Sequence, residues 1–197
     1  LPSSSDPVLS NITFDALAET YYLQAKYLVE GGVDVLLIET AQDILEMKAA
    51  LIGFEQLFAE LGRRVAVQAQ ITLDTSGRML LGTDIASAMA TLEALRVDVI
   101  GLNCSTGPEH MREPIRYLSE HASRPLSVIP NAGLPLNTGV GEAVYPLEPG
   151  PMPAQLRADR PLAGVHQAHE RAELAGEAGC VLPMRRREAR ARRQRRF

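Results

Sequence analysis

The sequence predicts an α/β fold with a parallel sheet, because short apolar runs alternate with helical patterns along most of the chain. Four runs are rich in β-branched residues or leucine and are bounded by Gly, Asp, Asn or Pro: Val33–Ile38, Val65–Thr72, Val97–Leu102 and Leu126–Pro130. They begin about 30 residues apart, enough for a strand, a crossover helix and two loops. Two architectures fit this repeat, an open doubly wound sheet and a (β/α)8 barrel.

The segments between these runs have the start and stop signals of helices. The expected helices follow the cap Thr13, span about Gln42–Leu61, follow the cap Thr83 and begin near Pro114. Gly31-Gly32 and Gly62 are expected to end the first two helices. A proline suits the first helical position because its missing N–H has no partner there in any case.

The composition is that of a globular domain rather than a membrane or disulfide-rich protein. The chain has 197 residues, of which 46% are hydrophobic and 22% charged, with no Trp and two Cys. No apolar run approaches the ~20 residues of a membrane span, and no signal peptide is recognisable. Two cysteines exclude a disulfide scaffold and fit a reducing compartment, so a cytoplasmic protein is expected.

The charge is unevenly spread, and this divides the chain into residues 1–156 and 157–197. The first part is acidic, whereas the second has 11 Arg and only 5 acidic residues. The second part also lacks a strand-like run, so we expect loosely packed helix and coil there. A frameshifted or chimeric gene end would explain the change. A basic tail that binds nucleic acid is the less favoured alternative, because aromatic residues are not interleaved with the arginines.

Polar groups follow each apolar run, where parallel α/β proteins place their active sites. Glu39 follows the first run, Asp74 the second, Asn103 and Cys104 the third, and Asn131 the fourth. A carboxylate, thiol or amide at the end of a buried strand needs a partner to offset its desolvation. The Asp74–Gly77 segment also fits an ordinary polar loop. No glycine-rich phosphate loop follows any run, which weakens a nucleotide-binding function.

Four segments resemble the homocysteine S-methyltransferase family, most closely the homocysteine-binding domain of the bacterial cobalamin-dependent methionine synthases. They are LVEGGVDVLLIETAQD (28–43), QITLDTSGRMLLG (70–82), VIGLNCSTGP (99–108) and VIPNAGLP (128–135). The resemblance covers residues 1 to about 149 and implies a partial (β/α)8 TIM barrel, with this chain supplying about strands four to seven. It also implies that residues 1–156 form part of a homocysteine-binding domain and that homocysteine accepts a methyl group to give methionine.

The resemblance assigns roles to four residues. Cys104 matches the first of three cysteine thiolates that bind zinc in the family. Glu39 would hold the homocysteine amino group, Asn131 would lie beside the amino-acid end of the substrate, and Asn103 is a further substrate-binding candidate. The methyl donor would be methylcobalamin on another module, and the partners would be the cobalamin- and folate-binding modules of a complete protein.

Part of the family pattern has no counterpart in this sequence. The adjacent cysteine pair that completes the zinc site is absent, and the remaining cysteine, Cys180, does not match it. His166 and His169 have a spacing compatible with metal binding, but the surrounding segment favours a solvated helix or coil. One thiolate cannot make a tight zinc site. The alternative hypothesis is therefore a catalytically inactive half-barrel or an interaction protein.

Overall fold

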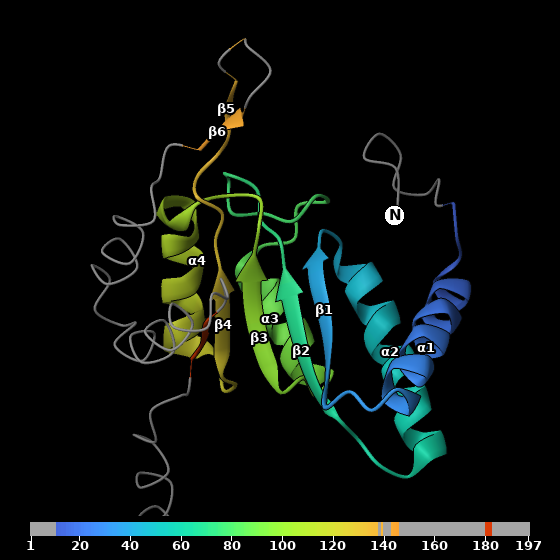
Figure 1. The fold of residues 1–197 in the computed structure, drawn as a ribbon. Coiled ribbons are helices and arrows are strands. Elements are labelled where there is room, and N and C mark those ends of the chain that lie inside the picture. Colours follow the sequence, from blue (N-terminus) through green and yellow to red (C-terminus); the bar gives the residue numbers. More distant parts are fainter. Residues whose placement is uncertain (1–10, 138, 140–142, 146–179, 183–197) are drawn as a thin grey trace, which may run out of the picture.

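A computed structural model of the chain describes residues 11–137, 139, 143–145 and 180–182. Its main sheet has five strands in the order β1-β2-β3-β4-β7 (Figure 1). The first four are parallel: β1 (Val35–Ala41), β2 (Ala66–Ile71), β3 (Val99–Asn103) and β4 (Leu126–Ile129). The prediction of four parallel strands that alternate with helices is confirmed. Because consecutive strands are also neighbours, each crossover moves the chain one strand along, as in the wall of a barrel.

The helices are α1 (Phe14–Glu30), α2 (Ile44–Leu61), α3 (Ile85–Ala94) and α4 (Pro108–His121). Three of the predicted helix ends are confirmed, one of them the stop of α1 at Gly31. The hydroxyl of Thr13 accepts a hydrogen bond from the backbone N–H of Ala16, as expected of an N-cap. α2 stops at Gly62, whose φ of 63° is left-handed and therefore suits glycine.

Two predicted helix starts are wrong. α3 is capped by Asp84 rather than Thr83, because the Asp84 carboxylate accepts the N–H of Ser87. α4 begins at Pro108, so Pro114 lies inside the helix. The first-turn position that tolerates a missing N–H is taken by Pro108, soon after the end of β3.

The apolar core lies between the sheet and the helices, on what is here called the helix-covered face. Side chains of alternating strand residues fill it, namely Leu36, Ile38, Val67, Ala69, Ile100, Leu102, Leu126 and Val128, all of which are buried. α1 packs on α2 at unusually close range. A Cβ atom added at Gly53 of α2 would collide with the backbone oxygen of Ala18 and lie 2.8 Å from the backbone nitrogen of Tyr22.

The opposite side of the sheet, the open face, is more polar. Val35 and Leu37 of β1 are about half exposed on it, at 49% and 46%. Gln70 of β2 is fully buried, and its amide donates to the hydroxyl of Ser127 on β4 at 2.8 Å. This bond crosses β3 at Gly101, where an added Cβ would lie 2.9 Å from Cγ of Gln70. The glycine is therefore required for the contact between β2 and β4.

Two short additions flank the parallel strands. β5 (Leu136–Asn137) and β6 (Ala143–Val144) form an antiparallel hairpin beyond the carboxyl end of β4 (Figure 1). β7 (Cys180–Leu182) lies antiparallel beside β4. The expectation of only helix and coil after residue 156 is therefore wrong for these three residues. Their backbone pairs with the edge of β4, which needs no long apolar pattern in the sequence.

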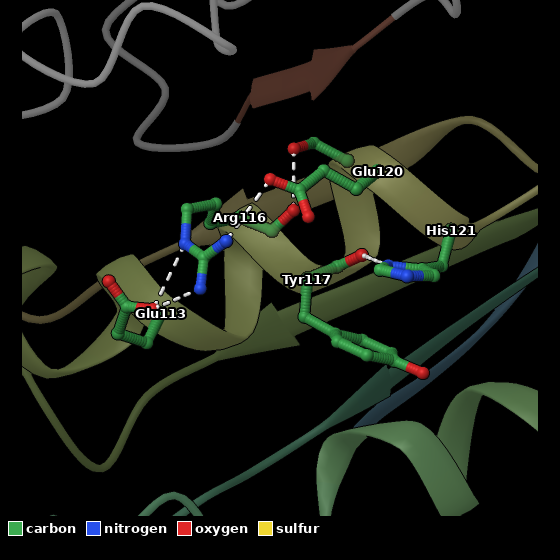
Figure 2. Close-up of polar contacts among 6 residues, drawn as sticks. Glu113, Arg116, Tyr117, Glu120 and His121 are labelled. Carbon is green, nitrogen blue, oxygen red and sulfur yellow. Dashed lines mark hydrogen bonds and ion pairs between the residues drawn. The ribbon is translucent and has the colours of Figure 1, made fainter.

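Exposed charged side chains of α4 pair with one another along the helix (Figure 2). The Arg116 guanidinium pairs with the carboxylates of Glu113 at 2.6 Å and Glu120 at 3.1 Å. The hydrogen bond from Arg116, together with its positive charge, holds the pKa of Glu113 below its usual range. The ring of Tyr117 stacks on that of His121 with 4.2 Å between centroids. All these side chains belong to one helix, and their spacing of three and four residues accounts for the contacts.

Among the described helices, none combines the length and the apolar character that crossing a lipid bilayer demands.

Candidate functional site

The carboxyl ends of the four parallel strands form one edge of the sheet, here called the carboxyl edge. Glu39 lies near the carboxyl end of β1, Cys104 directly follows β3, and Asn131 follows β4 by two residues. Because the strands are parallel and consecutive, the three residues lie at the same edge. The sequence predicted this arrangement, and an antiparallel pairing would have separated them.

A β-bulge in β1 shapes the first part of this edge. Ile38 pairs with Ala69 and Ala41 with Ile71, so Glu39 and Thr40 together lie opposite one residue of β2. Thr40 has a φ of 59°, a left-handed conformation that is unfavourable for a β-branched residue. Bulges of this kind redirect side chains next to binding sites. The side chain of Glu39 is left exposed, on the face away from the helices.

The side chain of Asn103 joins the ends of β1 and β3, which are not neighbours in the sheet. The backbone N–H of Thr40 donates to Oδ1 of Asn103 at 3.0 Å, and Nδ2 of Asn103 donates to the Thr40 hydroxyl at 2.7 Å. Between them lies the end of β2, where the hydroxyl of Thr72 donates to the backbone oxygen of Asn103 at 2.9 Å. Both Asn103 and Thr72 are buried. These bonds fix three strand ends to one another.

Cys104 lies at the centre of this network and is partly exposed. Its φ is 56°, and that of Ser105 is 62°, so the chain turns sharply as it leaves β3. The thiol sulfur lies 3.4 Å from Nδ2 of Asn103 and 3.8 Å from the hydroxyl of Thr40. The sulfur therefore has hydrogen-bond donors on two different strands.

The loops after β3 and β4 are also joined. The backbone N–H of Cys104 donates to the oxygen of Ile129 at 3.1 Å, and that of Asn131 donates to the oxygen of Thr106 at 3.1 Å. The loop that carries Cys104 is thus held against the loop that carries Asn131. Hydrogen bonds run without interruption from β1 to the end of β4.

Asp74, which follows β2, has a local structural role. Its carboxylate accepts hydrogen bonds from the hydroxyl and N–H of Ser76, at 2.6 and 2.8 Å, and from the N–H of Arg78. The Ser76 side chain and these backbone donors lower the pKa of Asp74. The carboxylate thereby closes its own turn, which is the simpler of the two interpretations that the sequence left open.

The groups that surround the Cys104 sulfur are not suitable ligands for a zinc ion. Zinc takes thiolate, imidazole or carboxylate ligands in a tetrahedral arrangement. The neighbours of the sulfur are an amide N–H group, which has no free lone pair, and a neutral hydroxyl. In the described part of the chain, no three His, Cys, Asp or Glu side chains gather to hold a metal. His166 and His169 lie outside the described residues.

Thr40 and Thr72 were not among the site residues predicted from the sequence. Thr40 lies two residues after the first apolar run and Thr72 is the last residue of the second, so their place at the carboxyl ends of predicted strands was the available signal. Neither the bulge nor the left-handed φ can be read from a threonine, because threonine disfavours that conformation.

Comparisons with known proteins agree with the fold. A family model described as Homocysteine S-methyltransferase matches residues 2–180. Methionine synthases of Mycobacterium leprae and Mycobacterium tuberculosis are each 44% identical over 148 residues, which is 75% of this chain. The chain spans only 12% of the length of either relative.

Solved structures of the homocysteine methyltransferase MmuM from Escherichia coli have a similar fold. The metallated form matches with a TM-score of 0.53 and 24% identity over 64% of this chain, and the apo form with 0.50 and 22% over 59%. In both cases 42% of the solved chain is covered.

Proposed function

The chain belongs to the homocysteine S-methyltransferase family, and we propose that it is a segment of the homocysteine-binding domain of a methionine synthase. In this proposal β1–β4 are about the fourth to seventh strands of a (β/α)8 barrel. The strand order supports it, because consecutive parallel neighbours are what a barrel wall requires. The remaining strands would come from elsewhere in a longer protein.

The proposed ligand is homocysteine, which offers an ammonium group, a carboxylate and a thiol. The exposed carboxylate of Glu39 complements the ammonium group by a charge-assisted hydrogen bond. Asn131 would lie beside the amino-acid end of the ligand. The sequence also suggested Asn103 as a substrate contact, and this stays a prediction.

The proposed reaction of the complete protein transfers a methyl group to the homocysteine sulfur. A free thiol has a pKa of about 8.5, so at neutral pH it is mostly protonated and a poor nucleophile. When bound on another module of a complete protein, methylcobalamin would supply the methyl group. The thiol proton would pass to solvent, and the carbon–cobalt bond would break with both electrons staying on cobalt as the methyl carbon bonds to the homocysteine sulfur, giving methionine. The described residues supply one thiol toward the zinc site expected in such a domain. We therefore propose that this chain binds homocysteine but does not transfer the methyl group alone.

The observation that carries the proposal is the hydrogen-bonded edge that brings Glu39, Cys104 and Asn131 to the same ends of parallel strands. Other polar clusters of the described residues lie on the helices or away from the carboxyl ends of the strands: Arg116 pairs within α4, Lys26 of α1 pairs with Glu60 of α2, and Arg64 pairs with Asp98 ahead of β3. Within the part of the chain that the structure describes, only the carboxyl edge combines an exposed carboxylate, a thiol and an amide at the ends of three strands.

The test is calorimetric titration of the full chain with L-homocysteine under reducing conditions. We expect Glu39→Gln to weaken binding at least ~10-fold, the equivalent of about 1.4 kcal/mol. The control is Glu19→Gln, the same substitution at an exposed position of α1, which should leave binding unchanged. Absence of binding in the unsubstituted chain, or equal binding by Glu39→Gln, would contradict the proposal.

A further inference from the structure

Among the described non-glycine residues, left-handed backbone is concentrated at the carboxyl edge. Four described non-glycine residues have a positive φ: Thr40, Arg96, Cys104 and Ser105. Thr40 and Cys104 hydrogen-bond with the side chain of Asn103, and Ser105 follows Cys104 in the chain. Such conformations persist only where the surrounding contacts enforce them, and they are frequent at functional sites.

The amide of Asn103 is committed to contacts within the protein. Its oxygen accepts from the backbone of Thr40, and its nitrogen donates to the Thr40 hydroxyl and to the Cys104 sulfur. An amide nitrogen has two protons, so both are accounted for. The side chain is also fully buried. No donor of Asn103 is left for a ligand.

The hydroxyl of Thr40 completes the arrangement around the sulfur. It accepts from Asn103 at 2.7 Å, which leaves its own proton free to point at the Cys104 sulfur 3.8 Å away. The sulfur is therefore held from the β3 side by an amide and from the β1 side by a hydroxyl. Thr40 also adjoins Glu39, so one residue touches the thiol and sets the place of the carboxylate.

We propose that Thr40 and Asn103 are positioning residues, which hold the Cys104 thiol in one rotamer at a fixed place relative to Glu39. Asn103 then acts through Thr40 and Cys104 instead of contacting homocysteine. This inference rests on the proposed function, because it concerns the same site. A purely structural role, in which the bonds only tie β1 to β3, is the competing explanation.

The test separates these roles by removing the Thr40 hydroxyl alone. Thr40→Val keeps the size, the β-branch and the backbone N–H, whereas Thr40→Ser restores the hydroxyl. Thr20→Val is the matched control, because the Thr20 hydroxyl bonds only within α1. The χ1 rotamer of Cys104 is measured by three-bond NMR couplings in the full chain with isotope-labelled cysteine, and Cys180→Ser assigns the two cysteine signals.

We expect one Cys104 rotamer in the unsubstituted chain, in Thr40→Ser and in Thr20→Val, and averaged couplings in Thr40→Val. The dissociation constant for homocysteine should rise about 10-fold in Thr40→Val and less than about 3-fold in Thr40→Ser. Should Thr40→Val fail to fold, Thr40→Gly removes the same hydroxyl while relieving the left-handed strain. The same averaging is expected from it.

A single Cys104 rotamer and unchanged affinity in both Thr40→Val and Thr40→Gly would overturn the inference, even if their stability fell. Averaged couplings in the unsubstituted chain would also overturn it. Failure of the unsubstituted chain to bind homocysteine would count against the proposed function only, because the couplings are read without the ligand.

Discussion

The helix-covered face and the carboxyl edge of the same sheet both contain buried residues, but they are built in opposite ways. The face is apolar and regular, with side chains such as Ile100 and Val67 almost completely shielded from water. The edge buries polar groups, Asn103 and Thr72 among them, and contains a bulge and three left-handed residues. Burial of apolar surface stabilises the fold, whereas the strained polar edge costs stability and persists because its hydrogen bonds are satisfied.

The two regions should therefore respond differently to substitution. Changes on the helix-covered face should alter stability and leave ligand binding intact. Changes at the edge should alter binding with little effect on stability.

The largest expected effect is that of Gly53→Ala between α1 and α2. The added methyl group would collide with the backbone of Ala18 and approach that of Tyr22, which cannot move aside as a side chain could. We expect the free energy of unfolding to fall by about 3 kcal/mol, measured by urea denaturation. Gln56→Ala on the exposed side of α2 is the control. A loss below about 1 kcal/mol would show that the helices separate easily.

The second prediction concerns metal at the edge. Because Cys104 is the one thiol found there among the described residues, we expect retained zinc well below one ion per chain after dialysis against a mild chelator. Elemental analysis gives the amount. One zinc per chain that survives Cys180→Ser but not Cys104→Ser would mean that further ligands complete the site, contrary to this account.

Two left-handed residues allow a matched comparison. Thr40 lies at the edge, whereas Arg96 lies at the opposite end of β3, between α3 and the strand. Glycine relieves the strain at either position but has more conformational freedom in the unfolded chain, so both variants should remain within about 1 kcal/mol of the unsubstituted stability. Only Thr40→Gly should weaken homocysteine binding. Equal binding by the two variants would remove the distinction between the regions.

A smaller effect is expected from Tyr21 at the interface of α1 and α2. Burial, and then the neighbouring Glu46, which accepts its hydrogen bond at 3.1 Å, raise the pKa of Tyr21 to about 12. The unfolded value is about 10, so the native state favours the protonated phenol. The resulting stabilisation is complete below about pH 10 and is lost as the pH rises toward about 12. Tyr21→Phe should flatten this part of the stability–pH profile, and an unchanged slope would contradict the assignment.

The smallest effect should come from the ion pairs of α4 (Figure 2). Arg116 is half exposed, and solvent screens its contacts with Glu113 and Glu120. Arg116→Ala should change the free energy of unfolding by less than about 0.5 kcal/mol. A larger loss in urea denaturation would show that this surface contributes to the core.

The sequence was sufficient to predict the parallel strands and the common edge of Glu39, Cys104 and Asn131. The apolar runs mark buried strands, and the polar site residues come at the ends of these runs. The starts of α3 and α4 were mistaken, because Asp84 and Pro108 compete with equally plausible neighbours. The Thr40 bulge and the pairing of β7 were not predictable, since both depend on contacts between distant segments.

The central claim is that homocysteine binds at the carboxyl edge, and NMR mapping of the full chain tests it most directly. Backbone amide signals are followed during titration with L-homocysteine. The account predicts that the largest shifts fall on Thr40, Cys104 and Asn131, while the buried residues of the helix-covered face stay nearly unchanged. Shifts confined to the helices, or no shifts at saturating homocysteine, would contradict it.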